Sequence, residues 1–149
     1  MSEYNIRYSV KNKDLLEEVK KEISKYAARL TDDKGTPLYD LIKVYSADVS
    51  LVDDFLRDAV DQFYMRFQDV ARIVESYGEG FAISLYLPDI DSEMVSTAEA
   101  ELNRFLTVQI CAFWLSTRYE QGSKLYADRA LASLSRLIEI LRTRKAPQR

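Results

Sequence analysis

The chain has 149 residues, 47% of them hydrophobic and 30% charged, with a net charge of −3. This is the length of one domain, and with only four glycines and three prolines the composition excludes a turn-rich β-sandwich or a disordered chain and favours long helices. The lack of histidine and the single cysteine exclude a Ser-His-Asp triad, a histidine metal site, an intramolecular disulfide and a zinc ribbon. Residue chemistry therefore reveals no activity and no cofactor is expected, so we look for function in shape, charge distribution and contact surfaces.

Residues 4–10 are predicted to form a half-buried strand. Tyr4, Ile6, Tyr8 and Val10 alternate with polar residues, and this period of two is typical of a strand with one buried face. The strand either belongs to the chain's own sheet or is an arm, residues 1–11, that adds to the sheet of a neighbouring subunit.

A helix of about five turns is predicted next, with Asn12 as its cap and residues 31–35 ending it. Its apolar stripe is Leu15, Val19, Ile23, Tyr26 and Leu30, at the spacing of one helix face.

Two further helices are predicted before the middle of the chain. Thr36 and Pro37 are a cap and a first helical residue for a short helix through Leu38, Leu41 and Ile42. A stronger helix begins at the capping-box-like pair Ser50 and Asp53 and ends near Arg72. Its apolar residues recur every four positions: Leu51, Phe55, Ala59, Phe63 and Phe67.

Residues 73–87 are predicted to form a β-hairpin, with the turn at 78–80 and Pro88 ending the second strand. An isolated hairpin is marginally stable. We expect it to be completed by the strand at 4–10, by a helix, or by another subunit.

Two long antiparallel helices are predicted to close the domain. The first runs from a cap at Asp91 or Ser92 to about Gln121, and Gly122 and Ser123 form the joint. The second carries Leu131, Leu134, Leu137, Ile138 and Leu141, and a basic tail follows at 142–149. The predicted fold is one mainly α domain over residues 1–149: a helical bundle with an inserted β-hairpin and a possible N-terminal strand.

Charge is distributed unevenly along the chain. Residues 51–100 carry three arginines against eleven acidic residues, a net charge of −8, and residues 101–149 carry nine basic residues against four acidic ones, a net charge of +5. This split either attracts copies of the chain or a second protein, or is an ordinary mixed surface. The tail residues Arg142, Arg144, Lys145 and Arg149 are either solvated or contact an acidic protein surface, and contact with nucleic-acid phosphates is the third interpretation.

The sequence gives only weak support for a metal site and for a nucleophilic cysteine. Asp54, Asp58 and Asp61 share a helix face; they form either a metal site or a solvated face with Asp53–Arg57 and Arg57–Asp61 ion pairs. Cys111 lies among apolar residues, which favours a core thiol over a nucleophile.

The start of the chain lacks an apolar signal core, and the longest apolar run, 110–115, is far shorter than the roughly 20 residues of a membrane span. We expect a soluble protein from a reducing compartment, with no membrane partner.

The ten tyrosines are too many to be buried in one small domain. Exposed tyrosines are typical of subunit contacts, although some are simply half-buried. The predicted contact residues are Tyr4, Tyr8, Tyr39, Tyr77 and Tyr86.

The order of these elements resembles a known family. A helix ends in Asp-Asp-Lys-Gly at 32–35 and Leu-Tyr-Asp-Leu-Ile follows at 38–42; then come a long amphipathic helix, a hairpin ending in Leu87-Pro88, a long aromatic helix and a last helix with an arginine-rich tail. Over about residues 12–145 this resembles the head–tail connector (adaptor) proteins of tailed bacteriophages, especially those that infect gut Bacteroidales.

The resemblance implies a structural virion protein and not an enzyme, made in the host cytoplasm and located at the head–tail joint. Such proteins form rings of typically about twelve copies that sit under the portal, meet the next tail or ring protein and extend the channel through which DNA passes without specific binding. It also implies that the C-terminal segment docks on the portal, which here is Leu141, Arg142, Arg144, Lys145 and Arg149. The alternative is a small cytosolic helical adaptor or regulator that receives one protein partner in an apolar groove.

Overall fold

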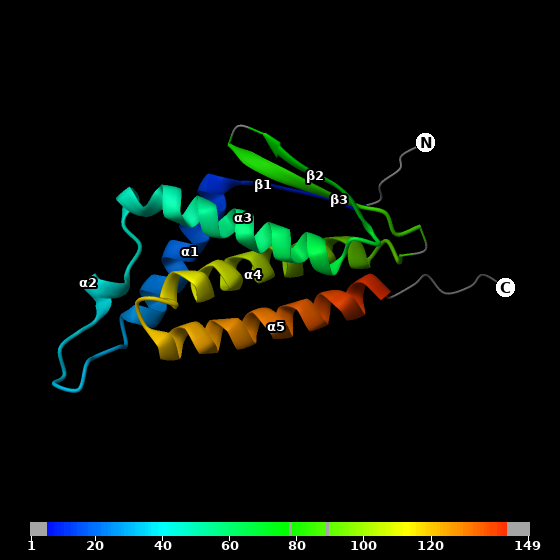
Figure 1. The fold of residues 1–149 in the computed structure, drawn as a ribbon. Helices are drawn as coiled ribbons and strands as arrows, with labels where there is room; N and C mark the ends of the chain where they lie inside the picture. The colour runs from blue at the N-terminus through cyan, green and yellow to red at the C-terminus, as the bar shows by residue number, and fades with distance from the viewer. Residues whose placement is uncertain (1–5, 78, 89, 143–149) are drawn as a thin grey trace.

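The computed structural model describes residues 6–77, 79–88 and 90–142, with the side chains of 46 and 72–77 left aside. The elements in chain order are β1 (Ile6–Lys11), α1 (Asn12–Ala27), α2 (Tyr39–Ile42), the 3₁₀ turn η1 (Ser46–Asp48), α3 (Val49–Arg66), β2 (Ala71–Tyr77), β3 (Gly80–Leu85), α4 (Met94–Leu115) and α5 (Glu120–Arg142). The mainly α fold with a minor sheet is confirmed. In Figure 1, α3, α4 and α5 run along the length of the molecule, with α2 at one end and the last turn of α5 at the other.

The hairpin is completed by the chain's own N-terminal strand. The sheet order is β1-β3-β2, and both pairings are antiparallel. Ile6 pairs with Leu85 and Tyr8 with Ile83, while the N–H of Asn12 donates to the carbonyl of Glu79 at 2.7 Å. The described part of the strand therefore belongs to its own domain, and the interpretation of these residues as an arm on a neighbour's sheet is wrong.

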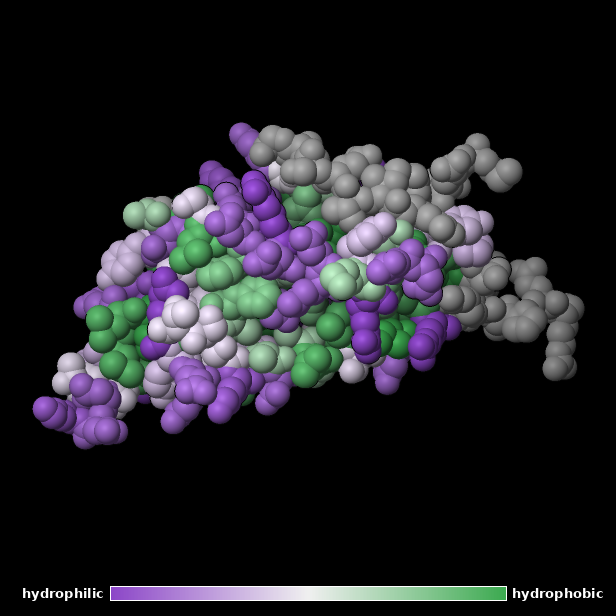
Figure 2. Space-filling view, in the orientation of Figure 1, coloured by the Kyte–Doolittle hydropathy of each residue, from purple (hydrophilic) through white to green (hydrophobic). Residues whose placement is uncertain are grey.

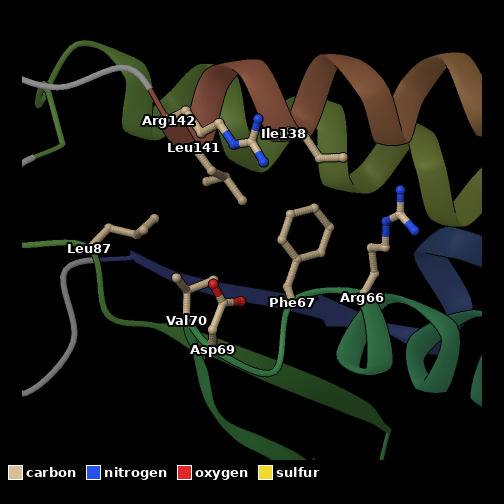
Figure 3. A pocket seen from close by; sticks show the side chains of 8 residues that line it. All are labelled: Arg66, Phe67, Asp69, Val70, Leu87, Ile138, Leu141 and Arg142. Carbon is tan, nitrogen blue, oxygen red and sulfur yellow. The ribbon is translucent and has the colours of Figure 1, made fainter.

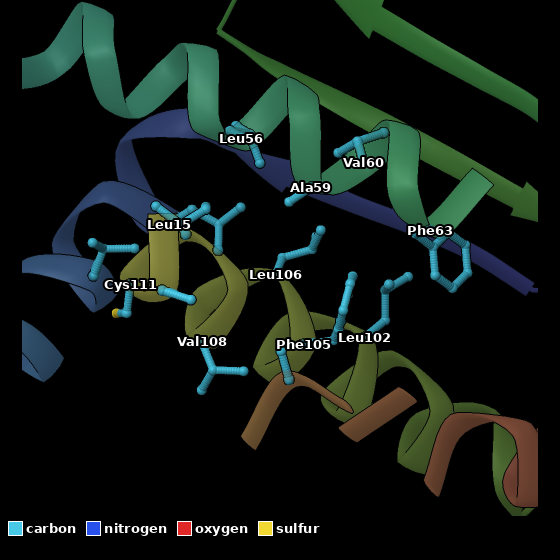
Figure 4. Close-up of a cluster of buried hydrophobic side chains, with 14 of the residues drawn as sticks. Leu15, Leu56, Ala59, Val60, Phe63, Leu102, Phe105, Leu106, Val108 and Cys111 are labelled. Atoms are coloured by element: carbon cyan, nitrogen blue, oxygen red, sulfur yellow. The ribbon is translucent and has the colours of Figure 1, made fainter. Parts of the chain in front are cut away.

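One apolar core joins the sheet to the helices, and α4 runs through its centre. Phe105, Leu106 and Ile110 of α4 are fully buried, as are Val19 of α1 and Phe63 of α3. Figure 4 shows α3 side chains directed toward α4. Burying each large apolar side chain is worth about 1.5–3 kcal/mol, so α4, which contributes the most buried residues, organises the domain.

Helix ends differ from the predicted ones. Lys11, not Asn12, precedes α1, which ends at Ala27 rather than at 31–35. Leu38, without a side-chain cap, precedes α2, so Thr36 and Pro37 do not start it; Pro37 instead bridges Thr31. Tertiary packing moved these helix ends away from the predicted capping residues. A capping residue contributes only about 0.5–2 kcal/mol to helix stability, so packing can override it.

The start and end of α3 are also displaced. The helix follows Asp48, so Ser50 and Asp53 are not its cap; the Asp48 carboxylate accepts the N–H of Tyr45 at 2.8 Å instead. The helix ends at Arg66, six residues before the predicted end, because Ala71 already pairs in the sheet.

The joint between α4 and α5 lies earlier than predicted. α4 ends at Leu115, and Gly122 lies inside α5 rather than after a helix. A Cβ at Gly122 would lie 2.7 Å from Cε1 of Tyr26. The glycine therefore serves the close approach of α1 to α5, and Ser123, also inside α5, donates its hydroxyl to the carbonyl of Ala112 at 2.9 Å.

Candidate functional site

The predicted portal-docking residues fall into three groups. Leu141 is 4% exposed, so its side chain is part of the core and its prediction as a docking residue is wrong. Arg142 ends α5 and is exposed. Arg144, Lys145 and Arg149 lie outside the described residues.

The predicted tyrosine contacts also include buried, exposed and undescribed side chains. Tyr8 is buried, and its hydroxyl donates to Oδ1 of Asn103 at 2.7 Å; its prediction as a surface contact is wrong, because one face of β1 packs on α4. Tyr39 is half-buried and Tyr86 is exposed. Tyr4 and the side chain of Tyr77 lie outside the described part.

The aspartates of α3 form no metal site. Asp54, Asp58 and Asp61 are exposed, and in the described residues no group of three His, Cys, Asp or Glu side chains is placed to hold a metal ion. The ion pairs predicted for Arg57 are not formed within the same part of the chain. Cys111 is buried, which confirms a core thiol, and burial raises its pKa.

Much of the positive charge of the C-terminal half is satisfied within the domain. Nε of Arg136 lies 2.9 Å from Oε1 of Glu101, which also accepts the hydroxyl of Ser133 at 2.6 Å. Arg129 lies 3.6 Å from Glu22. The C-terminal half therefore presents fewer unpaired cations than the net charge of +5 counted for residues 101–149 suggests.

A cavity of about 370 Å³ lies between α3 and α5, near the end of the molecule where both helices end. Figure 3 shows Phe67 extending upward from the end of α3, with Leu141 pointing down from α5. The lining residues are Arg66, Phe67, Asp69, Val70, Leu87, Ile138, Leu141 and Arg142.

The cavity is lined by apolar and charged side chains together, and the charged ones are two arginines and the carboxylate of Asp69. Phe67, Val70 and Ile138 supply hydrocarbon surface, whereas Arg66, Asp69 and Arg142 are exposed. Neither arginine forms an ion pair among the residues described here. Such a site suits an apolar side chain next to a carboxylate.

A second hollow, about 320 Å³, lies between α1 and α4. It is polar, and the carboxylate of Glu18 accepts the amide of Asn103 at 2.8 Å and the hydroxyl of Thr107 at 3.1 Å. These contacts use its polar groups to join the two helices, so the hollow serves packing.

The opposite end of the molecule carries a projecting corner, residues 38–49, which we call the α2 corner. Leu41 is 75% exposed, and Tyr45 and Val49 are also exposed; Figure 2 shows green hydrophobic surface at this end. Nζ of Lys43 lies 4.7 Å from the centre of the Tyr45 ring. The corner is anchored from below, since Nε1 of the buried Trp114 donates to the carbonyl of Ile42 at 2.7 Å.

Sequence reasoning missed both the cavity and the α2 corner. The cavity joins residues about 70 positions apart in the chain, so no local pattern marks it. The corner had a signal in two adjacent apolar residues, Leu41 and Ile42, of which a four-residue helix buries only one.

No described helix is both long enough and apolar enough to cross a membrane. Comparison with family models, curated proteins and solved structures finds no match to this chain.

Proposed function

We propose that this chain is a structural subunit of a bacteriophage head–tail connector ring, in which about twelve copies sit under the portal and extend the DNA channel. The proposal starts from the element order of the sequence, because the helices and the hairpin on which the resemblance rests, over about residues 12–145, occur in the predicted order. The next tail or ring protein is the expected partner on the other side.

The observation that carries the proposal is the presence of two different apolar surfaces at opposite ends of one elongated subunit. Leu41, Tyr45 and Val49 are exposed at one end, and Tyr64 and Met65 are exposed in the last turn of α3, directly before the cavity residue Arg66 in the sequence. Val49 and Met65 lie on one helix, 16 residues and therefore about 24 Å apart.

Two unlike surfaces suit a ring. A ring is built from heterologous contacts, in which one patch of each subunit meets a different patch of the next. Large exposed apolar side chains gathered in one place are a common mark of protein contact sites.

Portal docking is assigned to residues 142–149 alone, since Leu141 is buried. Arg142 begins this segment at the surface, and the following residues add Arg144, Lys145 and Arg149. A basic segment favours an acidic surface on the portal, and such contacts weaken with salt.

The test is reconstitution with the portal protein encoded by the same genome, followed by light scattering and electron microscopy. We expect rings on the portal, and we expect a chain lacking residues 142–149 to keep its fold but lose docking. A deletion of 1–5 is the matched control and should dock normally. A chain that stays monomeric with the portal and is missing from virions would refute the proposal.

The alternative, a cytosolic adaptor with one protein partner, is favoured by a single observation, the apolar α3–α5 cavity. It predicts a one-to-one complex that is lost when Ile138 is replaced by Asp. Particle size in the same reconstitution separates it from a ring.

A further inference from the structure

We propose that the contact between neighbouring subunits is made by the α2 corner of one copy, with Leu41 seated in the α3–α5 cavity of the next and Asp40 beside its rim arginine Arg66. This inference rests on the proposed ring function and names the partner of both surfaces as a second copy of this chain.

The α2 corner has the properties of an insertion element. Leu41 is the most exposed of the large hydrophobic side chains in the described residues, at 75%. Its neighbour Ile42 is buried, and the Ile42 carbonyl is held by Trp114 at 2.7 Å. Because the backbone is anchored one residue away, Leu41 is presented in a fixed position, and little conformational freedom is lost on binding.

The cavity offers what Leu41 requires. Phe67 and Ile138 face each other across a cavity of about 370 Å³ between α3 and α5, and Val70 adds apolar surface. The volume of this cavity exceeds the volume of one leucine side chain, so part of α2 also enters it. Burial there removes apolar surface from water on both copies.

The corner carries the carboxylate of Asp40, and the cavity rim carries the guanidinium groups of Arg66 and Arg142 against one carboxylate, Asp69. Asp40 is directly before Leu41; its side chain is 83% exposed and pairs with Lys43 at 3.5 Å, its one ion-pair partner among the described residues. An exposed pair of this kind contributes little. Arg66 stands at the cavity rim without an ion pair among the described residues, and an arginine–carboxylate pair at a partly dehydrated interface is stronger than an exposed lysine pair.

The placement of the two surfaces on the subunit determines the assembly. In Figure 1, α2 lies at one end and the last turn of α5 at the other. One copy therefore offers its corner to the next copy and keeps its own cavity for a third, which produces a ring if the rotation closes. A side-by-side antiparallel pair would use both contacts at once and stop at a dimer, so the size of the assembly distinguishes the two.

The test uses mixed cysteine variants of the full chain. Copies carrying Leu41→Cys are mixed with differently tagged copies carrying Ile138→Cys, assembled with the portal protein and oxidised. We expect a disulfide between the two tags, because seated side chains bring the two Cβ atoms close together, and the native Cys111 is buried. Copies of either single variant alone should form no such disulfide.

A second arm measures assembly without cysteines. Leu41→Asp should weaken self-association at least tenfold, whereas Leu131→Asp, at a 63% exposed leucine of α5 that does not line the cavity, should not. Arg66→Glu should weaken it as well, and Asp40→Arg in the same chain should restore it. All four residues are exposed, so the thermal midpoints of the variants should match the parent and exclude unfolding as the cause.

The outcomes separate this inference from the proposed function. Rings on the portal with no disulfide and no effect of Leu41→Asp would overturn the contact and keep the ring. A disulfide-linked dimer or filament that does not bind the portal would keep the contact and overturn the connector. The cavity could instead be occupied by residues 143–149 or by a portal segment. In that case the new thiol of Ile138→Cys would be protected from a thiol reagent even in copies that also carry Leu41→Asp, and this result would overturn the contact.

Discussion

Replacing Trp114 by Phe should destabilise the protein and release the α2 corner. The indole is 1% exposed, and its Nε1 donates to the carbonyl of Ile42 at 2.7 Å. Without that donor the buried carbonyl is unsatisfied, which costs about 1–3 kcal/mol. The smaller ring also leaves a void, which adds about 1 kcal/mol if roughly 40 Å³ stays empty.

The expected total is a loss of about 2–4 kcal/mol in the free energy of unfolding, a large part of the roughly 5–15 kcal/mol of a typical domain. Urea unfolding followed by circular dichroism measures this loss. Hydrogen exchange of residues 38–45 measures the local release, and we expect these amides to exchange faster than the overall loss of stability explains.

The matched control is Phe63→Leu, which shortens another fully buried aromatic residue, near the end of α3 that is away from the corner. It should lower global stability without specifically exposing residues 38–45. If the two variants gave the same exchange pattern in that segment, the Trp114 hydrogen bond would not be what anchors the corner, and the reasoning above would be refuted.

Three further predictions follow from buried groups. Ser84→Ala should raise the urea midpoint, because the Ser84 hydroxyl is buried without a hydrogen-bond partner in the described structure and such a group costs about 1–3 kcal/mol; a lower midpoint would show a missed partner. Burial raises the pKa of Tyr8 and of Tyr126 above the ordinary value, so both stay protonated longer in the folded than in the unfolded state. Above about pH 10 stability should therefore fall by about 1.4 kcal/mol per pH unit for each tyrosine; urea titrations at pH 8, 10 and 11 measure the slope, and Tyr126→Phe should reduce it. Gly122→Val should cost about 1–3 kcal/mol, because the added Cβ meets Tyr26 at 2.7 Å, and a thermal midpoint equal to the parent's would contradict this packing.

The ring proposal changes the meaning of the charge pattern. Arg129 and Arg136 are paired inside the domain, so they have little left to offer a partner. Arg66, Arg142 and the exposed aspartates of α3 retain their charge at the surface. Assembly should therefore depend on salt through a few contacts at the cavity rim and the C-terminal segment rather than through a global attraction between acidic and basic halves.

The main elements of the fold were predictable from the sequence because each has its own period. Alternation at Ile6, Tyr8 and Val10 predicted a strand, and recurrence every four residues from Phe55 to Phe67 predicted a helix. Apolar residues at these spacings have to share one face of the element, whatever surrounds it. Long helices separated by few glycines and prolines then required a bundle.

The helix ends and the exposure of the predicted contact residues depend on tertiary packing. Glycine is typical of a position just after a helix end, yet Gly122 lies inside α5. A glycine is needed there because the ring of Tyr26 of α1 occupies the space that a side chain would fill. Tyr8 and Leu141 have the chemistry of contact residues, but the core buries both of them. Capping and exposure preferences are worth about 1 kcal/mol each, less than the burial of one large side chain, so packing prevails wherever the two conflict.

By itself, the sequence determined which segments are helices and which are strands, the single core and the lack of histidine chemistry, since these follow from local period and composition. Only the tertiary structure decided that the N-terminal strand completes its own sheet, that Leu41 projects while Ile42 is anchored, and that α3 and α5 enclose a cavity. Each of these depends on residues far apart in the chain meeting in space, and their mutual distance is set by the packing of all the helices on α4, which no local stretch of sequence encodes.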